Sequence, residues 1–280
     1  MDPVYKKKLF TVLYHGVIIS IGLIMIYPLL WMIMGSFKTS STALSPTLIP
    51  DQLNLVNFIE GWKGFGGLSF SVFFRNSFFI SIIATIGQVF LSALTAYGFS
   101  RLEFPGRKIL FGIMITTLLL PMTILRIPQY IMFNEIGWVN SFKPVILPQM
   151  FPLPFFVFLM VQFLKGISTE LDKAAMVDGC SKYGVFFRVL LPILKPAMIT
   201  AGIFSFYWTW NDFMSPLLYL QSTDLYPVSL ALHLFSDPDT VTNWGALFAM
   251  STLSVTPIFL IFLFFQKYIV EGISTSGLKQ

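Results

Sequence analysis

A short polar run inside an apolar segment holds side chains that could bind a solute or an ion: Trp208, Thr209, Trp210, Asn211 and Asp212. Aromatic faces and amides suit ring-shaped, hydroxyl-rich solutes, whereas an intramembrane carboxylate can bind an ion or relay a proton. Arg126, at the end of another apolar segment, is a further candidate for the same path. The alternative is structural, with the tryptophans in an interfacial belt and Asp212 capping or packing between helices.

Residues for enzymatic chemistry are sparse. The two histidines, His15 and His233, are far apart in sequence, so there is no histidine metal pair and no HExxH helix. The end of the chain, 272–279, has glycines spaced as in a phosphate loop, but Leu278 follows the second glycine where a lysine is required. We therefore predict no catalytic residue, no metal and no cofactor in this chain.

The longest charged stretch between apolar segments is 168–196. Thr169 followed by Asp172 is a capping signal, and acids in a first turn oppose the helix dipole, so a short helix is expected from about Glu170 to Asp178. Gly179 is expected just past its end in a left-handed conformation. Ser181 can cap a second helix, which prolines interrupt; it contains Tyr183, Phe186, Phe187, Pro192 and Pro196.

Composition places these residues in a membrane. Of 280 residues, 55% are hydrophobic and 11% charged, and the mean hydropathy is +0.76. These values exclude an ordinary soluble domain and predict an all-α membrane protein with a single domain over 1–280. The predicted spans are about 9–34, 71–99, 109–131, 144–164, 197–220 and 244–265, and four prolines in the first half of the fourth predict a broken helix there.

Basic residues indicate which loops are cytoplasmic. Lysine and arginine gather at both ends of the chain, in the turn around Pro105 and in the stretch 168–192, whereas the loops assigned to the outside hold few. The bias predicts both termini in the cytosol of a bacterial cell membrane. The net charge of +5 is explained by this topology, so no nucleic-acid partner is expected. The single cysteine, Cys180, excludes an internal disulfide.

The charged stretch resembles the cytoplasmic coupling loop, or EAA motif, of permease subunits of binding-protein-dependent ABC importers. In the carbohydrate-uptake branch, which includes the maltose-type permeases, the pattern reads roughly E-L-x-E-A-A-x-x-D-G, and residues 170–179 read ELDKAAMVDG. Lys173 departs from it, since the family has glutamate there. The segments YPLLWMIMGSFK, AYGFSR, FPGRK, WND and QKYIVEG also resemble that branch, so the likeness covers nearly the whole chain.

The resemblance implies one half of an alternating-access channel with the fold of type I importers. It implies a heterodimer with a second, similar permease, two cytoplasmic ATPase subunits that bind ATP and magnesium, and an extracytoplasmic binding protein that delivers an oligosaccharide or related carbohydrate. The residues implied to couple to the ATPase are Glu170, Asp172, Lys173, Ala174, Ala175, Asp178 and Gly179. We expect the two alanines to form a low surface that sinks into a cleft of the ATPase.

Two further sites are hypotheses on the same basis. The translocation path is expected to include Trp208, Trp210, Asn211, Asp212 and Arg126. A flexible tail is expected to reach between the ATPase subunits with Ser276, Gly277 and Lys279. The rival function is an ion-coupled carrier that uses Asp212 with Asn211 and Arg126, but it leaves the long coupling loop unexplained.

Overall fold

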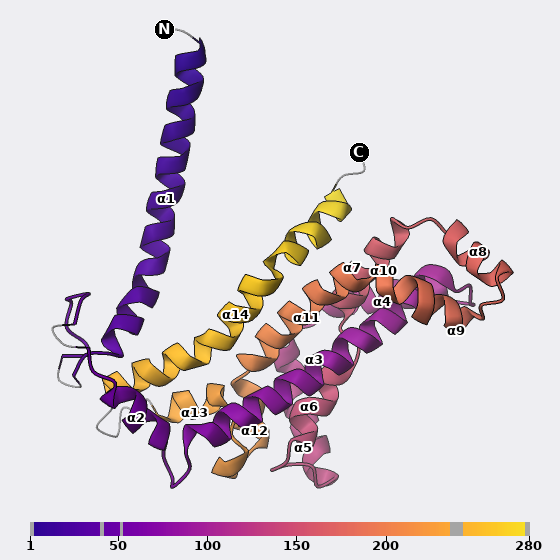
Figure 1. Ribbon diagram of the computed structural model, residues 1–280. Helices are drawn as coiled ribbons and strands as arrows, with labels where there is room; N and C mark the ends of the chain where they lie inside the picture. The colour runs from indigo at the N-terminus through magenta and orange to yellow at the C-terminus, as the bar shows by residue number, and fades with distance from the viewer. Residues whose placement is uncertain (1–2, 40–41, 51–52, 236–242, 278–280) are drawn as a thin grey trace. The chain divides into compact units, whose positions relative to one another are not determined.

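The computed structural model describes residues 3–39, 42–50, 53–235 and 243–277. Apart from one β-bridge between Phe65 and Leu68, their regular secondary structure is helical, as predicted (Figure 1). The chain falls into two compact units, Met1–Phe70 with Leu232–Val255, and Ser71–Ala231 with Thr256–Gln280. The single domain over 1–280 stays a prediction.

The first unit contains α1 (Pro3–Gly35), α2 (Val56–Lys63) and the first part of α14 (Trp244–Gly277). The buried amide of Asn57 fastens α2 to the chain that follows α1, because its Nδ2 atom donates to the carbonyls of Ser36 at 2.9 Å and Lys38 at 2.6 Å. Trp31 of α1 packs edge-on against Phe248 of α14, with ring centroids 5.2 Å apart.

The second unit holds the remaining helices, except that the first residue of α3 and residues 232–235 of α13 belong to the first unit. In chain order they are α3 (Phe70–Arg101), α4 (Arg107–Thr116), η1 (Thr117–Leu119), α5 (Met122–Glu135), α6 (Lys143–Met150), α7 (Pro154–Lys165), α8 (Glu170–Val177), α9 (Lys182–Gly184), η2 (Val185–Leu190), α10 (Leu191–Ile193), α11 (Lys195–Trp210), α12 (Met214–Tyr219), η3 (Thr223–Leu225) and α13 (Val228–Phe235). Its main core is formed by apolar residues of α3, α7, η2 and α11, among them Phe156, Met160, Leu164, Phe186 and Leu190.

Four of the predicted spans correspond to segments long and apolar enough to cross a membrane, and the other two correspond to bent helix pairs. The four are Phe10–Gly35, Phe70–Arg101, Lys143–Lys165 and Trp244–Tyr268. The predicted break in the fourth span is present between Met150 and Pro154, where α6 ends and α7 begins. Pro152 lies in the break and Pro154 starts α7, where a missing N–H group is tolerated, whereas Pro148 lies inside α6.

The predictions for the third and fifth spans were wrong in detail. The third is not one helix, since Arg107–Leu119 and Met122–Glu135 meet at 97° around Pro121. In the fifth, α11 ends at Trp210 instead of continuing to residue 220, and a 73° bend separates Lys195–Trp210 from the preceding helix. Pro128 lies inside α5 without ending it, so proline predicts a disturbance but not its size.

The long helix α3 is held near its start as well as at its end. Asn76 is buried, and its Nδ2 atom donates to the carbonyl oxygens of Asp224 at 2.7 Å and Tyr226 at 3.1 Å. These bonds satisfy a polar side chain inside an apolar helix and tie the segment around η3 to α3. The other end of α3 lies beside α8 and α9 (Figure 1).

Candidate functional site

The short helix α8 has the predicted form. It covers Glu170–Val177, and Gly179 follows with a φ of 87°. The N–H of Cys180 bonds back to the carbonyl of Ala175 at 2.9 Å, which closes the helix end as a glycine-dependent cap does. Ser181 caps the next helix, since its hydroxyl accepts from the N–H of Gly184 at 3.2 Å.

The second helix is disturbed where its prolines predict. Residues Val185–Leu190 form a π-helix directly before Pro192, and the N–H of Leu191 bonds to the carbonyl of Phe186. The wider turn is one way to accommodate a proline, whose ring would collide with the carbonyl four residues earlier in an α-helix. The chain then bends before Pro196, in the first turn of α11.

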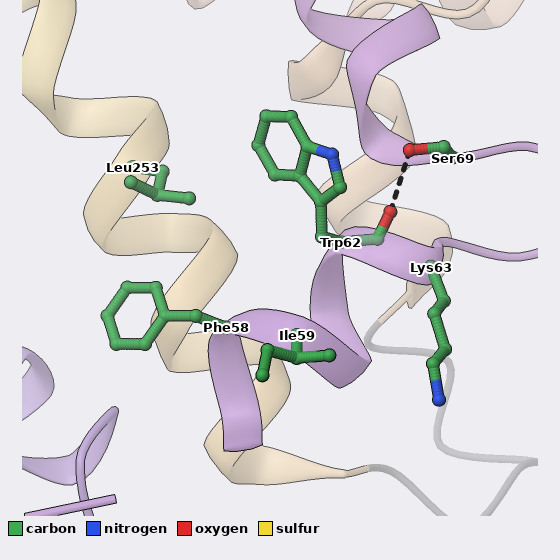
Figure 2. Close-up of a pocket in the computed structure, with 6 residues that line it drawn as sticks. All are labelled: Phe58, Ile59, Trp62, Lys63, Ser69 and Leu253. Carbon is green, nitrogen blue, oxygen red and sulfur yellow. Dashed lines mark hydrogen bonds between the residues drawn. The ribbon is translucent and has the colours of Figure 1, made fainter. Parts of the chain in front are cut away.

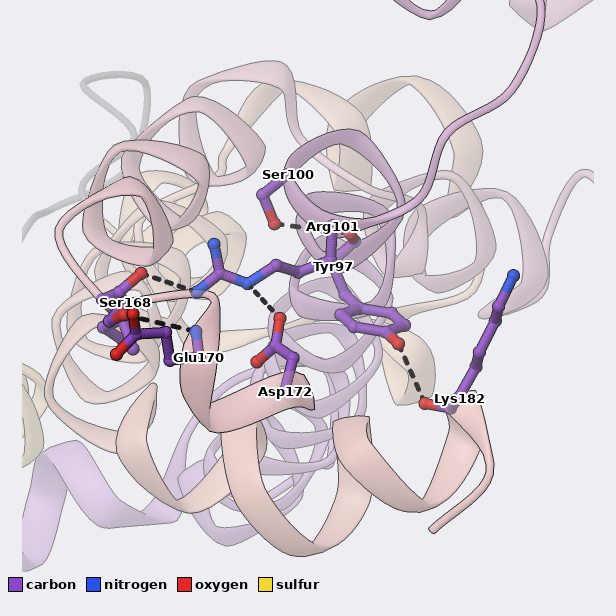
Figure 3. Close-up of polar contacts among 8 residues, drawn as sticks. Tyr97, Ser100, Arg101, Ser168, Glu170, Asp172 and Lys182 are labelled. Atoms are coloured by element: carbon purple, nitrogen blue, oxygen red, sulfur yellow. Dashed lines mark hydrogen bonds and ion pairs between the residues drawn. The ribbon is translucent and has the colours of Figure 1, made fainter. Parts of the chain in front are cut away.

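The predicted capping of α8 by Thr169 was wrong. Thr169 has helical backbone angles and makes no side-chain cap; instead the hydroxyl of Ser168 accepts from the N–H of Glu170 at 3.2 Å. Asp172 takes no part in a cap because a buried cation binds it. Its Oδ2 atom lies 2.7 Å from Nε of Arg101, the last residue of α3 (Figure 3).

This ion pair fastens α8, near the start of the charged stretch 168–196, to α3. The two side chains are only 6% and 11% exposed, and the Nη2 atom of Arg101 also donates to the carbonyl of Ile167 at 2.9 Å. Burial raises the pKa of the Asp172 carboxyl, and Arg101 offsets part of that rise. Asp172 Oδ1 is buried and has no hydrogen-bond partner among the described residues. The buried negative charge of Asp172 is therefore stabilised mainly by Arg101.

The other end of the stretch is fastened to the same turn of α3. The hydroxyl of Tyr97 donates to the carbonyl of Lys182 at 2.9 Å (Figure 3), and its ring packs on Phe186 with centroids 5.1 Å apart. Residues of one helical turn, Tyr97 and Arg101, thus bind the chain both before and after α8. We call these two residues with Asp172 the α3 clamp.

The faces of α8 differ from our expectation at one position. Ala175 is buried against the core of the second unit, whereas Ala174 is exposed. Ala175 therefore contacts the chain itself and is not part of a low outer surface. Glu170, Lys173 and Asp178 are exposed. Apolar side chains are exposed among them: Leu171, Met176, Val177 and Tyr183, of which the last two are 88% and 76% exposed.

The turn after α8 gives a direct test of the glycine requirement. Nothing lies within 4 Å of a Cβ built on Gly179, so Gly179→Ala adds only backbone strain, on the order of 1–2 kcal/mol. We expect the amides of Asp178 and Cys180 to exchange with solvent about tenfold faster in this variant. Gly184→Ala is the control, because Gly184 is helical and its Cβ would meet only ordinary contacts. Equal rates of amide exchange in the two variants would contradict the need for glycine at position 179.

A cavity of about 380 Å³ in the second unit gathers several of the predicted path residues. Arg126, Trp208 and Asp212 line it, together with residues that sequence reasoning did not assign to the path: Gln88, Gln149 and Thr209. Gln149 joins the group, since its Nε2 atom donates to Asp212 Oδ2 at 3.1 Å and its Oε1 atom accepts from Thr209 at 2.8 Å.

Two predicted path residues do not line this cavity. Trp210 is buried and stacks on Phe206 at 21° and a centroid distance of 5.4 Å. Asn211 is exposed and donates to the carbonyl of Tyr207 at 2.8 Å. Neighbouring residues of α11 point about 100° apart, so Trp210 points away from the side of the helix that carries Trp208. Asn211 and Asp212 lie past the end of α11, where helical spacing no longer relates them to Trp208.

Two other regions add little chemistry. An apolar pocket of about 580 Å³ in the first unit is lined by Phe58, Ile59, Trp62, Lys63, Ser69 and Leu253 (Figure 2). Its serine hydroxyl donates to the carbonyl of Trp62 at 2.8 Å.

At the carboxyl end, α14 continues to Gly277, so Ser276 and Gly277 are helical and the tail predicted to be flexible is shorter. Lys279 lies outside the described residues.

Known proteins resemble this chain over most of its length. It is 35% identical to a probable ABC transporter permease protein, YurM of Bacillus subtilis, covering 90% of this chain and 83% of that protein. It is 33% identical to the arabinooligosaccharides transport system permease protein AraQ of Halalkalibacterium halodurans, covering 92% and 93%.

A solved structure has the same fold. A chain of a bacterial ABC transporter involved in the import of the acidic polysaccharide alginate matches with a TM-score of 0.81 at 17% identity, covering 94% of this chain and 97% of that one. Residues 88–275, which include the α3 clamp, α8 and the cavity-lining residues, match the family described as binding-protein-dependent transport system inner membrane component. The chain is a multi-pass membrane protein that belongs to this family of transport permeases.

Proposed function

We propose that this chain is one of two permease subunits of an ATP-driven carbohydrate importer, where it forms half of the translocation path and couples it to a cytoplasmic ATPase. The observation that carries the proposal is the outer face of the coupling stretch. Exposed apolar side chains, including Val177 of α8 and Tyr183 of α9, lie among charged ones on a segment that the α3 clamp binds to α3. Such a face suits a protein partner.

The partners and the solute rest on the relatives and on side-chain chemistry. Relatives named for arabinooligosaccharide transport support a carbohydrate, and the half-exposed Trp208 offers an aromatic face of the kind that sugar rings stack on. The proposed assembly has a second homologous permease, two ATPase subunits that bind ATP and hydrolyse it, and an extracytoplasmic solute-binding protein. Both termini are proposed to be cytoplasmic from the positions of lysine and arginine.

Two experiments test whether the chain is part of an ATP-driven importer: co-purification of its partners and measurement of the energy source for uptake. The affinity-tagged chain, expressed with the proteins of its own cell, should bring down an ATPase and a second permease. In liposomes with its binding protein, uptake should require ATP inside and should continue when an uncoupler removes the proton gradient. An ion-coupled carrier gives the opposite result, with uptake that stops on uncoupling and needs no ATPase.

A further inference from the structure

Arg126 lines the cavity of the second unit and forms no ion pair among the residues that the structure describes. Its Nη1 atom is buried and has no hydrogen-bond partner in the part of the chain that the structure describes. The ion pairs found there are Glu60–Lys63 and Arg101–Asp172, and Arg126 belongs to neither. A buried donor without an acceptor is unfavourable, so a ligand that supplies an acceptor gains affinity.

The carboxylate in the cavity is already engaged. Asp212 Oδ1 accepts from the backbone N–H of Ser215 at 3.2 Å, and Oδ2 accepts from Gln149 at 3.1 Å. The remaining oxygen of Gln149 accepts from Thr209. Asp212 and Gln149 thus bind each other and link α6, α11 and α12. Neither oxygen of Asp212 forms an ion pair with Arg126.

A second donor faces the same space. Gln88 lines the cavity from α3, and its Oε1 atom accepts from the hydroxyl of Ser205 at 2.8 Å. This bond leaves the Gln88 amide N–H groups without a hydrogen-bond partner among the described residues. The unused polar groups of Arg126 and Gln88 are therefore donors, which suit an anion, while Gln129, which also lines the cavity, offers an amide with both donors and an acceptor.

Trp208 supplies an apolar platform in the same cavity. One face of its ring stacks on Phe156 at an interplanar angle of 12° and a centroid distance of 5.4 Å, while 44% of the side chain remains exposed. A stacked indole is rigid, so it offers its open face without loss of rotamer freedom. A volume of about 380 Å³ is within the usual range for small-molecule sites.

We propose that the cavity binds an acidic sugar, with a ring carboxylate on Arg126 and Gln88 and the sugar ring on Trp208. The inference rests on the proposed function, because it names the class of carbohydrate that the importer carries. A carboxylate can accept two parallel hydrogen bonds from a guanidinium, which a hydroxyl group cannot match.

The test compares uronates with neutral hexoses. The permease pair and its ATPase are purified together in nanodiscs, and intrinsic tryptophan fluorescence is titrated with glucuronate, galacturonate and mannuronate, each against glucose, galactose or mannose. We expect at least one uronate to bind about tenfold or more tightly than its neutral counterpart. Arg126→Gln should abolish that preference. Arg75→Gln, which removes an exposed arginine of α3, should retain it.

The outcomes separate this inference from the proposed function. If no ATPase and no second permease co-purify, the proposed function fails. If the complex assembles but every uronate binds no better than its hexose, or Arg126→Gln keeps the preference, the acidic-sugar site is refuted. If Arg126→Gln separates the two permeases, the arginine pairs across their interface, and the site is refuted as well.

Discussion

Replacement of Arg101 with methionine is expected to abolish substrate-stimulated ATP hydrolysis by the assembled importer. The change leaves the buried Asp172 without its cation and removes the bond to Ile167 at the start of α8. Loss of one partner from a buried pair costs about 3–5 kcal/mol, so the coupling stretch should detach from α3. Hydrolysis is measured in liposomes with and without the loaded binding protein, alongside the unfolding temperature of the chain.

The chain provides a matched control. Glu60 and Lys63 form an ion pair at the same distance of 2.7 Å, but their side chains are 45% and 65% exposed. Lys63→Met should therefore change stability and coupling little. The double variant Arg101→Met with Asp172→Leu should regain stability, because two apolar side chains replace a buried pair. Equal effects of Arg101→Met and Lys63→Met would show that the clamp does not hold α8.

Tryptophan at two adjacent alanines is expected to give two different defects. Ala175 lies in the core beside Val185 and Phe186, so Ala175→Trp should overpack it and destabilise the chain by about 1–3 kcal/mol. Ala174 is exposed on the outer face of α8. Ala174→Trp should leave the unfolding temperature unchanged and block the ATPase by bulk, with loss of co-purification.

Thermal unfolding in detergent and co-purification with the ATPase distinguish the two. Ala175→Ser is the control for the inner position, since it changes volume little. A stable Ala175→Trp chain that still fails to bind the ATPase would place residue 175 in the docking surface, as the sequence alone had suggested. A fully coupled Ala174→Trp complex would exclude the outer face as the contact.

Local features of the coupling stretch could be predicted because neighbouring residues determine them. The length of α8, the left-handed Gly179 and the cap at Ser181 depend on residues within one turn. The apolar length of a helix is similarly a local property, and segments long and apolar enough to cross a membrane lie at the first, second, fourth and sixth predicted spans.

The rest depends on residues that are distant in sequence. Arg101 could be identified as a basic residue after a span, but nothing in a single sequence pairs it with Asp172. The inward face of an eight-residue helix is set by what lies beneath it, which is why Ala175 was assigned to the wrong side. The 97° bend at Pro121 is another such case, since proline disturbs a helix but tertiary packing decides whether the helix breaks and at what angle.

The continuous helix α3 has a consequence for the kinetics of transport. Its 32 residues make a rod about 48 Å long, which is secured near one end through Asn76 and at the other through Arg101. Gln88, which lines the cavity, lies between these two anchors on the same rod. Because a straight helix resists compression, displacement of α8 should shift the cavity wall and the segment around η3 simultaneously. We therefore expect the end of this unit near α8 and the end near η3 to relax in one concerted phase, without a populated intermediate in which only one end has moved.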